Sequence, residues 1–282
     1  MSLQVPKPSN GNSKKHNNRP IAVFSDFDGT IFHQDTGHVL FDKYGCGQEK
    51  REELDGSIGD TRSFREASEL MWGSLTVSLD EALELLKKDL VLDDHFKPFL
   101  DFCDEQNIPF SVISAGLQPL LRGALDQFLG KERSSKINIV SNDAEIDGSN
   151  WKPLWRHDCE LGHDKARSIN EMKETVFDGA QPLTVFVGDG VSDLAAANHA
   201  DILFARRGLK LEKYCIKNKI PYIPYDTFED VQVELERMIN AQKEDEQDNR
   251  NATANIPKNP VSGRPIALRT VSENSVPNSV LI

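Results

Sequence analysis

Long apolar runs are missing from this chain of 282 residues. No segment approaches the roughly 18 consecutive apolar residues that a membrane-spanning helix requires. The N-terminal region is rich in asparagine and lysine, and it lacks the apolar stretch of a secretory signal. We therefore expect a cytoplasmic protein without a membrane partner, and a nuclear location also fits this composition.

Cysteine is scarce too. The four cysteines, at positions 46, 103, 159 and 215, lie far apart and form no Cys-x-x-Cys pair. This spacing excludes a disulfide framework and a clustered zinc site, and it indicates reduced thiols. None of them is followed by the phosphate loop and arginine of a cysteine-dependent phosphatase, so we do not expect a thiol mechanism.

Positive charge is also in short supply, because 33 lysine and arginine residues face 45 aspartate and glutamate residues. The resulting net charge of −12 disfavours nucleic acid or an anionic membrane as the main partner. A hydrophobic content of 38% is nevertheless enough for a real core in one or two domains.

Short apolar runs alternate with helical patterns through the middle of the chain. Continuous apolar strands separated by helices predict an α/β fold with a Rossmann-like, doubly wound parallel sheet, covered on both faces. The expected strands are 21–25, 110–113, 137–140, 183–187, 202–205 and 222–223. The expected helices that follow them are 94–105, 117–129, 164–176, 193–199, 208–218 and 227–242.

A long insertion separates the first two expected strands. Residues 33–90 are expected to form a small helical cap, because they contain apolar residues at helical spacing. Its expected helices are 36–44, 48–54, 63–73 and 78–88. The catalytic core would then comprise residues 19–32 and 91–242. Residues 1–18 and 243–282 are polar and lack an amphipathic period, so both are predicted to be disordered.

The most informative segment is Asp26-Phe27-Asp28-Gly29-Thr30, which directly follows an apolar run. A spacing of two places both carboxylates on the same face of an extended chain. Adjacent carboxylates repel each other unless a cation lies between them or one carries a proton. A nucleophile and a general acid–base group over Mg²⁺ have this arrangement, although Asp-Gly is also a common turn pair.

Three further polar segments follow in order. Ser114 ends the second expected strand, Lys165 begins a helical pattern, and Asp189 and Asp193 follow the fourth strand. Ligands of parallel sheets bind beyond the carboxyl ends of the strands, so Asp26, Ser114 and Asp189 are expected to converge. Taken singly, Ser114 also fits a helix N-cap, Lys165 a solvated side chain, and Asp193 a helix-start carboxylate.

Together these four segments resemble the motifs of the haloacid dehalogenase-like phosphatase superfamily, over residues 19–240 or so. The order of the motifs, and the position of three of them directly after apolar runs, make the resemblance specific. The helical insertion is similar to the cap of the phosphoserine-phosphatase-like branch, which closes over the site. The resemblance implies a Mg²⁺-dependent phosphatase with the fold predicted above.

The resemblance also implies a role for each motif residue. Asp26 would attack phosphorus to form an aspartyl phosphate, and Asp28 would protonate the leaving group and then activate water. Ser114 would hold phosphoryl oxygens, and Lys165 would neutralise phosphoryl charge. An aspartate at position 28 is typical of phosphatases and phosphomutases, whereas the transport ATPases of this superfamily have threonine there.

The implied cofactor is Mg²⁺, with oxygen ligands only. Asp189 would bind the ion, and Asp193 would act either as a direct ligand or through an intervening group. Asp26 and the backbone carbonyl of Asp28 would supply further oxygens.

The insertion departs from phosphoserine phosphatases in one place. Those enzymes carry an arginine seven residues after the phenylalanine of a Phe-(Arg/Lys)-Glu-(Ala/Ser) motif, where this chain has Met71 after Phe64. Asp35 stands where they have a longer glutamate. Further candidate substrate contacts are Arg62, Arg65 and Gly116. The pattern is more similar to the sugar- and polyol-phosphate phosphatases and the methylthiopentenyl-phosphate phosphatases of this branch.

We therefore predict a Mg²⁺-dependent phosphomonoester hydrolase that acts on a small phosphorylated metabolite, a sugar or polyol phosphate. Phosphoserine phosphatase is the nearest alternative, and a phosphomutase is a more distant one. The alternative from another class is a protein that keeps this fold but acts only by binding, with partners that the sequence does not identify. The complete set of catalytic positions argues against it.

Overall fold

The computed structural model describes residues 19–175 and 181–254. The chain divides into two units, residues 1–242 and 243–282, and the first contains every strand described. Within the described ranges, no helix combines the length and apolar character needed to cross a bilayer. The predicted disordered segments are residues 1–18 and 243–282. Residues 1–18 and 255–282 lie outside the described part of the chain, and residues 243–254 are helical.

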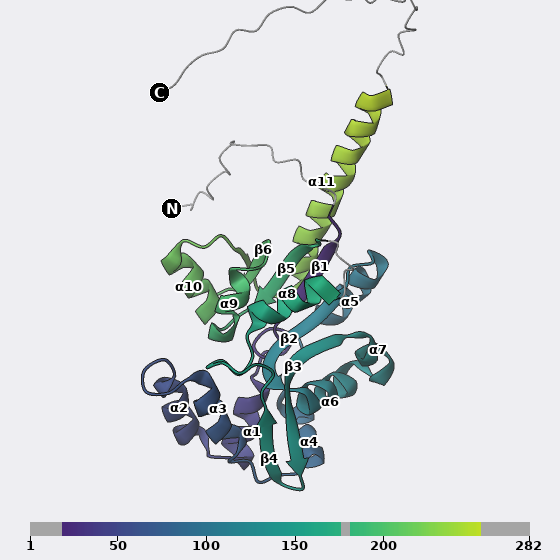
Figure 1. Cartoon of the computed structure of the whole chain (residues 1–282). Helices are drawn as coiled ribbons and strands as arrows, with labels where there is room; N and C mark the ends of the chain where they lie inside the picture. Colours follow the sequence, from purple (N-terminus) through teal and green to yellow (C-terminus); the bar gives the residue numbers. More distant parts are fainter. Residues whose placement is uncertain (1–18, 176–180, 255–282) are drawn as a thin grey trace, which may run out of the picture. The chain divides into compact units, whose positions relative to one another are not determined.

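A seven-stranded sheet forms the centre of the first unit, with the order β4-β3-β2-β1-β5-β6-β7 (Figure 1). Neighbouring strands are parallel except β3 and β4, which pair antiparallel. The central strand β1 is buried along its whole length, as expected for a continuous apolar run. The strands are β1 (Ile21–Ser25), β2 (Phe110–Leu117), β3 (Asn138–Asp147), β4 (Asn150–Leu154), β5 (Leu183–Gly188), β6 (Ile202–Arg206) and β7 (Ile223–Tyr225).

Helices fill the connections, and each predicted helix begins within two residues of its expected start. In the insertion they are α1 (Thr36–Tyr44), α2 (Gln48–Ser57), α3 (Phe64–Trp72) and α4 (Leu79–Asp89). The others are α5 (Phe96–Glu105), α6 (Gln118–Leu129), α7 (Lys131–Lys136), α8 (Lys165–Thr175), the 3₁₀ turn η1 (Val191–Asp193), α9 (Leu194–Ala197), α10 (Lys210–Asn218) and α11 (Phe228–Ala254).

Helices cover both faces of the sheet. Successive side chains of a strand point to opposite faces, and here they enter two different apolar clusters. Val23 of β1 packs in one cluster with Phe99 of α5 and Phe228 of α11. The next residue, Phe24, packs in the other cluster, which includes Ile169 of α8 and residues of α10. The predicted α/β fold with a doubly wound parallel sheet is confirmed.

Several features differ from the predicted elements, and one is strand β2, which continues past its predicted end at residue 113 to Leu117. Strand β3 continues past residue 140, its predicted end, and turns at Gly148 (φ +59°) into the unpredicted strand β4. The later residues of β3 alternate between half-buried and exposed positions, so the apolar run that marks a buried strand is absent. The short helix α7 was also not predicted, and α11 extends to Ala254, beyond its predicted end at residue 242.

The insertion packs on the rest of the first unit at several places. At Gly123 of α6, a Cβ atom would lie 2.5 Å from the side chain of Leu83, so glycine permits the close contact between α4 and α6. Near β4, the indole N–H of Trp151 donates to the carbonyl of Val77 at 2.7 Å. Figure 1 shows α3 beside β4, in agreement with their contacts.

Candidate active site

Polar side chains gather where the central strands end. Asp26 follows β1 directly, and its backbone N–H donates to the carbonyl of Val187 in β5 at 2.9 Å. Ser25 and Val187 lie opposite each other in the parallel pair, so Asp26 and Asp189 leave the sheet side by side. Ser114 lies within β2, which neighbours β1 on the other side. The convergence expected from the order of the motifs is therefore present.

Three carboxylates of this edge form a compact oxygen cluster. One oxygen from each of Asp26, Asp189 and Asp193 lies within 4.8 Å of the other two. Asp26 and Asp193 are buried and Asp189 is half-buried. The donor set is purely oxygen, which is the set that Mg²⁺ prefers. The side chain of Asp28 is not a member of this cluster.

Lys165 is the cation of the cluster. Its Nζ lies 2.8 Å from Oδ1 of Asp26 and 2.7 Å from Oδ1 of Asp193, and its side chain is completely buried. Lys165 is the first residue of α8, and helical side chains point back toward the N-terminus, which directs this ammonium group at the strand ends. The interpretation of Lys165 as a solvated side chain is wrong.

The pKa values of this cluster are shifted by burial first and by the neighbouring charges second. Burial raises the pKa of Asp26, and the nearby Asp193 raises it further. Burial and then Asp193 also raise the pKa of Asp189, to about 7. Burial alone would lower the pKa of Lys165, but Asp193 and Asp26 together outweigh it and raise that pKa. A dication at the oxygen cluster would oppose all the carboxylate shifts, so the residues fit Mg²⁺.

The loop after β1 is shaped around Asp189. Gly29 has a φ of +70°, and a Cβ atom there would overlap the Asp189 carboxylate, so only glycine fits this position. The hydroxyl of Thr30 donates to Oδ1 of Asp189 at 3.2 Å. Both oxygens of Asp193 are engaged, since Oδ1 accepts from Lys165 and Oδ2 accepts from the N–H groups of residues 189 and 190, each at 3.0 Å.

Asp28 is held apart from the oxygen cluster. Its Oδ1 accepts from the N–H of Thr36, the first residue of α1, at 2.8 Å. Its Oδ2 faces Gly116, where a Cβ atom would lie 3.6 Å from it. Burial raises the pKa of Asp28, and the charge of Asp35 raises it further. A carboxyl group with a raised pKa is suited to giving up a proton and taking it back.

Ser114 lies across from Asp28. A Cβ atom at Gly116 would be 3.3 Å from Oγ of Ser114 and 3.6 Å from Oδ2 of Asp28, so the two groups border the same small space beside Gly116. Oγ of Ser114 accepts from the N–H of Gly116 at 3.0 Å. The N-cap of α6 is Leu117, so the alternative role of Ser114 as a helix N-cap is wrong.

The candidate substrate contacts from the insertion do not come together. Asp35 caps α1 by accepting from the N–H of His38 at 2.8 Å, and its charge reaches Asp28. Arg65 pairs with the exposed Asp158 at 2.8 Å and lies over the ring of Trp155. Met71 is 4% exposed and belongs to the larger apolar cluster. Arg62 is half-buried at the N-terminal end of the α3 region, where its N–H donates to the carbonyl of residue 57.

One buried residue of this region was not predicted. Arg206 ends β6 and donates to the carbonyl of Gly29 at 2.8 Å, to the carbonyl of Asp226 at 3.0 Å, and to the side chain of Asp93 at 3.4 Å. It also lies 3.0 Å from Nδ1 of His33. Arg206 thus fixes the loop that follows Asp28 by its contacts with the carbonyls of Gly29 and Thr30. The available signal was a charged residue at the end of an otherwise apolar strand.

A comparison with families of known proteins matches residues 23–198 to the haloacid dehalogenase-like hydrolases. The chain belongs to this family. The matched range contains Asp26, Asp28, Ser114, Lys165, Asp189 and Asp193. The predicted family and its hydrolase class are therefore confirmed.

The match to this chain covers nearly the whole length of several named relatives. Pdp3-interacting factor 1 of Schizosaccharomyces pombe is 41% identical over 78% of this chain and 97% of that protein. A polyol phosphate phosphatase of Saccharomyces cerevisiae is 38% identical over 78% of this chain and 95% of that protein. A 2-hydroxy-3-keto-5-methylthiopentenyl-1-phosphate phosphatase of Bacillus thuringiensis is 30% identical over 78% of this chain and 97% of that protein.

Solved structures show the same fold. A substrate-bound phosphoserine phosphatase superposes with a TM-score of 0.54 over 70% of this chain and 90% of that chain, at 16% sequence identity. At this identity the likeness concerns the fold alone.

Proposed function

We propose that this protein hydrolyses the phosphate monoester of a small neutral polyol or sugar through an aspartyl phosphate at Asp26, with Mg²⁺ as cofactor. The observation that carries the proposal is the buried group of Asp26, Lys165 and Asp193, with the carboxyl group of Asp28 held separately by the N–H of Thr36. The names of two relatives, a polyol phosphate phosphatase and a methylthiopentenyl-phosphate phosphatase, support the reaction class.

The first step forms a bond between a carboxylate oxygen of Asp26 and phosphorus, while the bond to the leaving oxygen breaks. Asp28 protonates that oxygen, because its raised pKa favours a carboxyl group that still carries a proton. In the second step Asp28 takes a proton from water, which attacks phosphorus and releases phosphate and Asp26. Lys165 stays 2.8 Å from Asp26 and neutralises its charge, which eases the approach of the phosphate dianion.

Asp26 and Asp189 would hold Mg²⁺, together with the backbone carbonyl of Asp28. The bound ion would neutralise phosphoryl charge and orient the oxygens for displacement. Asp193 would act from outside this set, because both its oxygens already accept hydrogen bonds from Lys165 and from the backbone. Its role would then be to position Lys165 and the turn that carries Asp189.

Residues 33–90 would form a cap over the site. The support for this is the hydrogen bond from the N–H of Thr36 to Asp28, since the first turn of α1 reaches the proposed acid–base group. Met71 stands where phosphoserine phosphatases carry arginine, and it lies in the apolar cluster, so this position offers no positive charge to a substrate carboxylate. Neutral hydroxyl groups need no such partner, so we expect the cap to favour polyols and sugars over phosphoserine.

A panel of phosphate monoesters with Mg²⁺ tests the proposal. We expect polyol or sugar phosphates to exceed phosphoserine in kcat/KM by about tenfold or more, which corresponds to roughly 1.4 kcal/mol of transition-state binding. Phosphoserine as the best substrate would move the chain to the serine-specific branch. Transfer of the phosphoryl group to another position of the substrate, without release of phosphate, would indicate a phosphomutase.

A second candidate function is binding to another protein. It is favoured by the relative named Pdp3-interacting factor 1, at 41% identity. Asp26→Asn separates the two functions, because it removes the nucleophile at almost constant shape. A binding role would survive this substitution in a pull-down experiment, whereas hydrolysis would not.

A further inference from the structure

Strand β2 carries a bulge next to Ser114. Its ladder with β3 pairs Ile113 with Val140 and resumes at Leu117 with Asn142, so residues 114–116 lie opposite a single residue of β3. Bulges next to active sites re-aim side chains and interrupt the regular hydrogen bonds of the ladder. The carbonyl groups of this segment therefore need other partners if they are buried.

Two buried side chains supply those partners. Nδ1 of His163 lies 2.6 Å from the carbonyl oxygen of Ser114, and Nδ2 of Asn142 donates to the carbonyl oxygen of Ala115 at 2.8 Å. His163 is 2% exposed and Asn142 is fully buried. Two consecutive carbonyls of the bulge are thus held from side chains outside β2.

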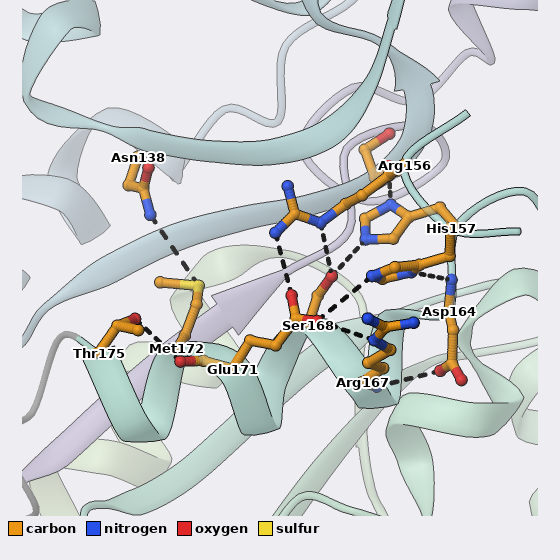
Figure 2. A network of polar contacts seen from close by, with 11 residues as sticks. Asn138, Arg156, His157, Asp164, Arg167, Ser168, Glu171, Met172 and Thr175 are labelled. Carbon is orange, nitrogen blue, oxygen red and sulfur yellow. Dashed lines mark hydrogen bonds and ion pairs between the residues drawn. The ribbon is translucent and has the colours of Figure 1, made fainter. Parts of the chain in front are cut away.

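The direction of the hydrogen bonds at His163 follows from chemistry. A carbonyl oxygen only accepts, so Nδ1 carries the proton and Nε2 is the acceptor. The hydroxyl of Ser168 in α8 must then donate to Nε2, at 2.8 Å, while Nε of Arg156 donates to that hydroxyl at 3.1 Å (Figure 2). Burial lowers the pKa of His163 to about 3, so the ring remains neutral and this direction persists at physiological pH.

Arg156 connects the two side chains that hold the bulge, His163 and Asn142. Its side chain reaches Ser168 and, at 3.2 Å, Glu171 of α8, as Figure 2 shows. Its backbone N–H donates to Oδ1 of Asn142 at 3.0 Å. The bulge that carries Ser114 is therefore connected, through His163 and Asn142, to the helix that begins with Lys165.

We propose that His163 and Asn142 are positioning residues, which hold the bulge of β2 so that the Ser114 hydroxyl faces the phosphoryl site beside Asp28. The role rests on the proposed phosphatase function, because it concerns the group that would bind phosphoryl oxygens. Neither residue touches the reacting atoms. A displacement of this hydroxyl by a fraction of an ångström would change the stabilisation of the transition state more than the binding of substrate.

A pair of substitutions at His163 tests this role. In His163→Asn the amide Nδ2 takes the place of Nδ1 and keeps the donor to Ser114, whereas His163→Leu removes it. With p-nitrophenyl phosphate and Mg²⁺, we expect His163→Leu to lower kcat by about tenfold or more with a change in KM below about threefold. His163→Asn should recover most of this loss, and Asn142→Leu should lower kcat in the same way.

Thr184→Val is the matched structural control. Thr184 is fully buried in β5, and its hydroxyl donates to Asp201 at 2.8 Å, at the end of the strand far from the site. The Thr184→Val variant should be less stable than the wild-type protein, with kcat unchanged. The proposal is overturned if His163→Leu and Thr184→Val, compared at equal fractions folded, have the same kcat, or if His163→Asn is as impaired as His163→Leu.

A binding readout keeps this test separate from the proposed activity. Orthovanadate with Mg²⁺, a mimic of the phosphoryl-transfer transition state, should raise the Tm of the wild-type protein, and His163→Leu should reduce that shift while His163→Asn preserves it. A wild-type protein that binds vanadate but hydrolyses no monoester would refute the proposed function and leave the positioning role to be decided by these shifts. A protein with neither property would refute both.

Discussion

Charged side chains lie in opposite environments at the carboxyl edge of the sheet and in the inserted helices. At the sheet edge, Lys165 is fully buried between two carboxylates. In the insertion, Arg65 pairs with Asp158, whose side chain is fully exposed. A buried charge that loses its partner is costly, whereas an exposed ion pair contributes little. Loss of a charged residue at the sheet edge should therefore cost much stability, whereas loss of one in the insertion should cost little.

The largest expected difference between the two regions is in turnover. Asp26→Asn should lower kcat by about 10⁴-fold or more, because the amide is a poor nucleophile. Asp55→Asn, which changes a partly exposed carboxylate of α2, should leave kcat within about twofold of wild type. Steady-state phosphate release from the best panel substrate measures both. Comparable turnover in purified Asp26→Asn and wild type would refute the assigned nucleophile.

Asp28→Asn should behave differently from Asp26→Asn, since the nucleophile remains. Loss of the acid–base group should remove most turnover, and with an activated aryl phosphate the phosphoenzyme should accumulate because water is no longer deprotonated. Acid quenching with a ³²P-labelled substrate would detect this species. Equal phosphoenzyme levels in Asp28→Asn and Asp26→Asn would contradict the separate roles of the two aspartates.

The second difference is in stability. Lys165→Met should lower the free energy of unfolding by about 3–5 kcal/mol near neutral pH, because Asp193 is left buried without its cation. Arg65→Met should cost less than about 1 kcal/mol. Urea unfolding followed by circular dichroism, in the absence of Mg²⁺, compares the two. Similar losses would mean that burial does not govern these ion pairs.

The third difference is in pH dependence. In the metal-free protein, the pKa of Asp189 rises from 3.8 to about 7, so this group favours the folded state at low pH. That contribution is lost as the pH rises through this range, because the buried carboxyl group must then ionise. The Tm without metal should therefore be higher at pH 5 than at pH 8. Mg²⁺ should raise the Tm most at pH 8, and EDTA should abolish activity until Mg²⁺ is restored.

The smallest difference concerns two glycines with positive φ. Gly59, in the insertion, has a φ of +82° and open space where a Cβ atom would lie, so Gly59→Ala should cost about 1 kcal/mol from backbone strain alone. Gly29→Ala should cost about 2 kcal/mol or more, since its methyl group also displaces the Asp189 carboxylate. Isothermal titration with Mg²⁺ should show weaker binding only in Gly29→Ala. Equal Mg²⁺ affinity in both variants would contradict the metal role of Asp189.

Prediction from the sequence succeeded where the signal is local. The apolar runs at β1 and β5 mark buried strands, and polar residues directly after them mark the edge of a parallel sheet. The hairpin β3–β4 gave no such signal, because an edge strand needs only half of its side chains to be apolar. The partners of Arg206 and His163 were equally hidden, since they lie far away in the sequence.

The sequence by itself determined the family, the order of the strands along the chain and the identity of the acidic residues, because these depend on periodicity and on short motifs. Only the tertiary structure decided that Lys165 is buried between Asp26 and Asp193, that both oxygens of Asp193 are engaged, and that Met71 lies in the apolar cluster. The physical reason is that burial and partner choice arise when distant segments pack, and no local pattern encodes which charge will lose its water.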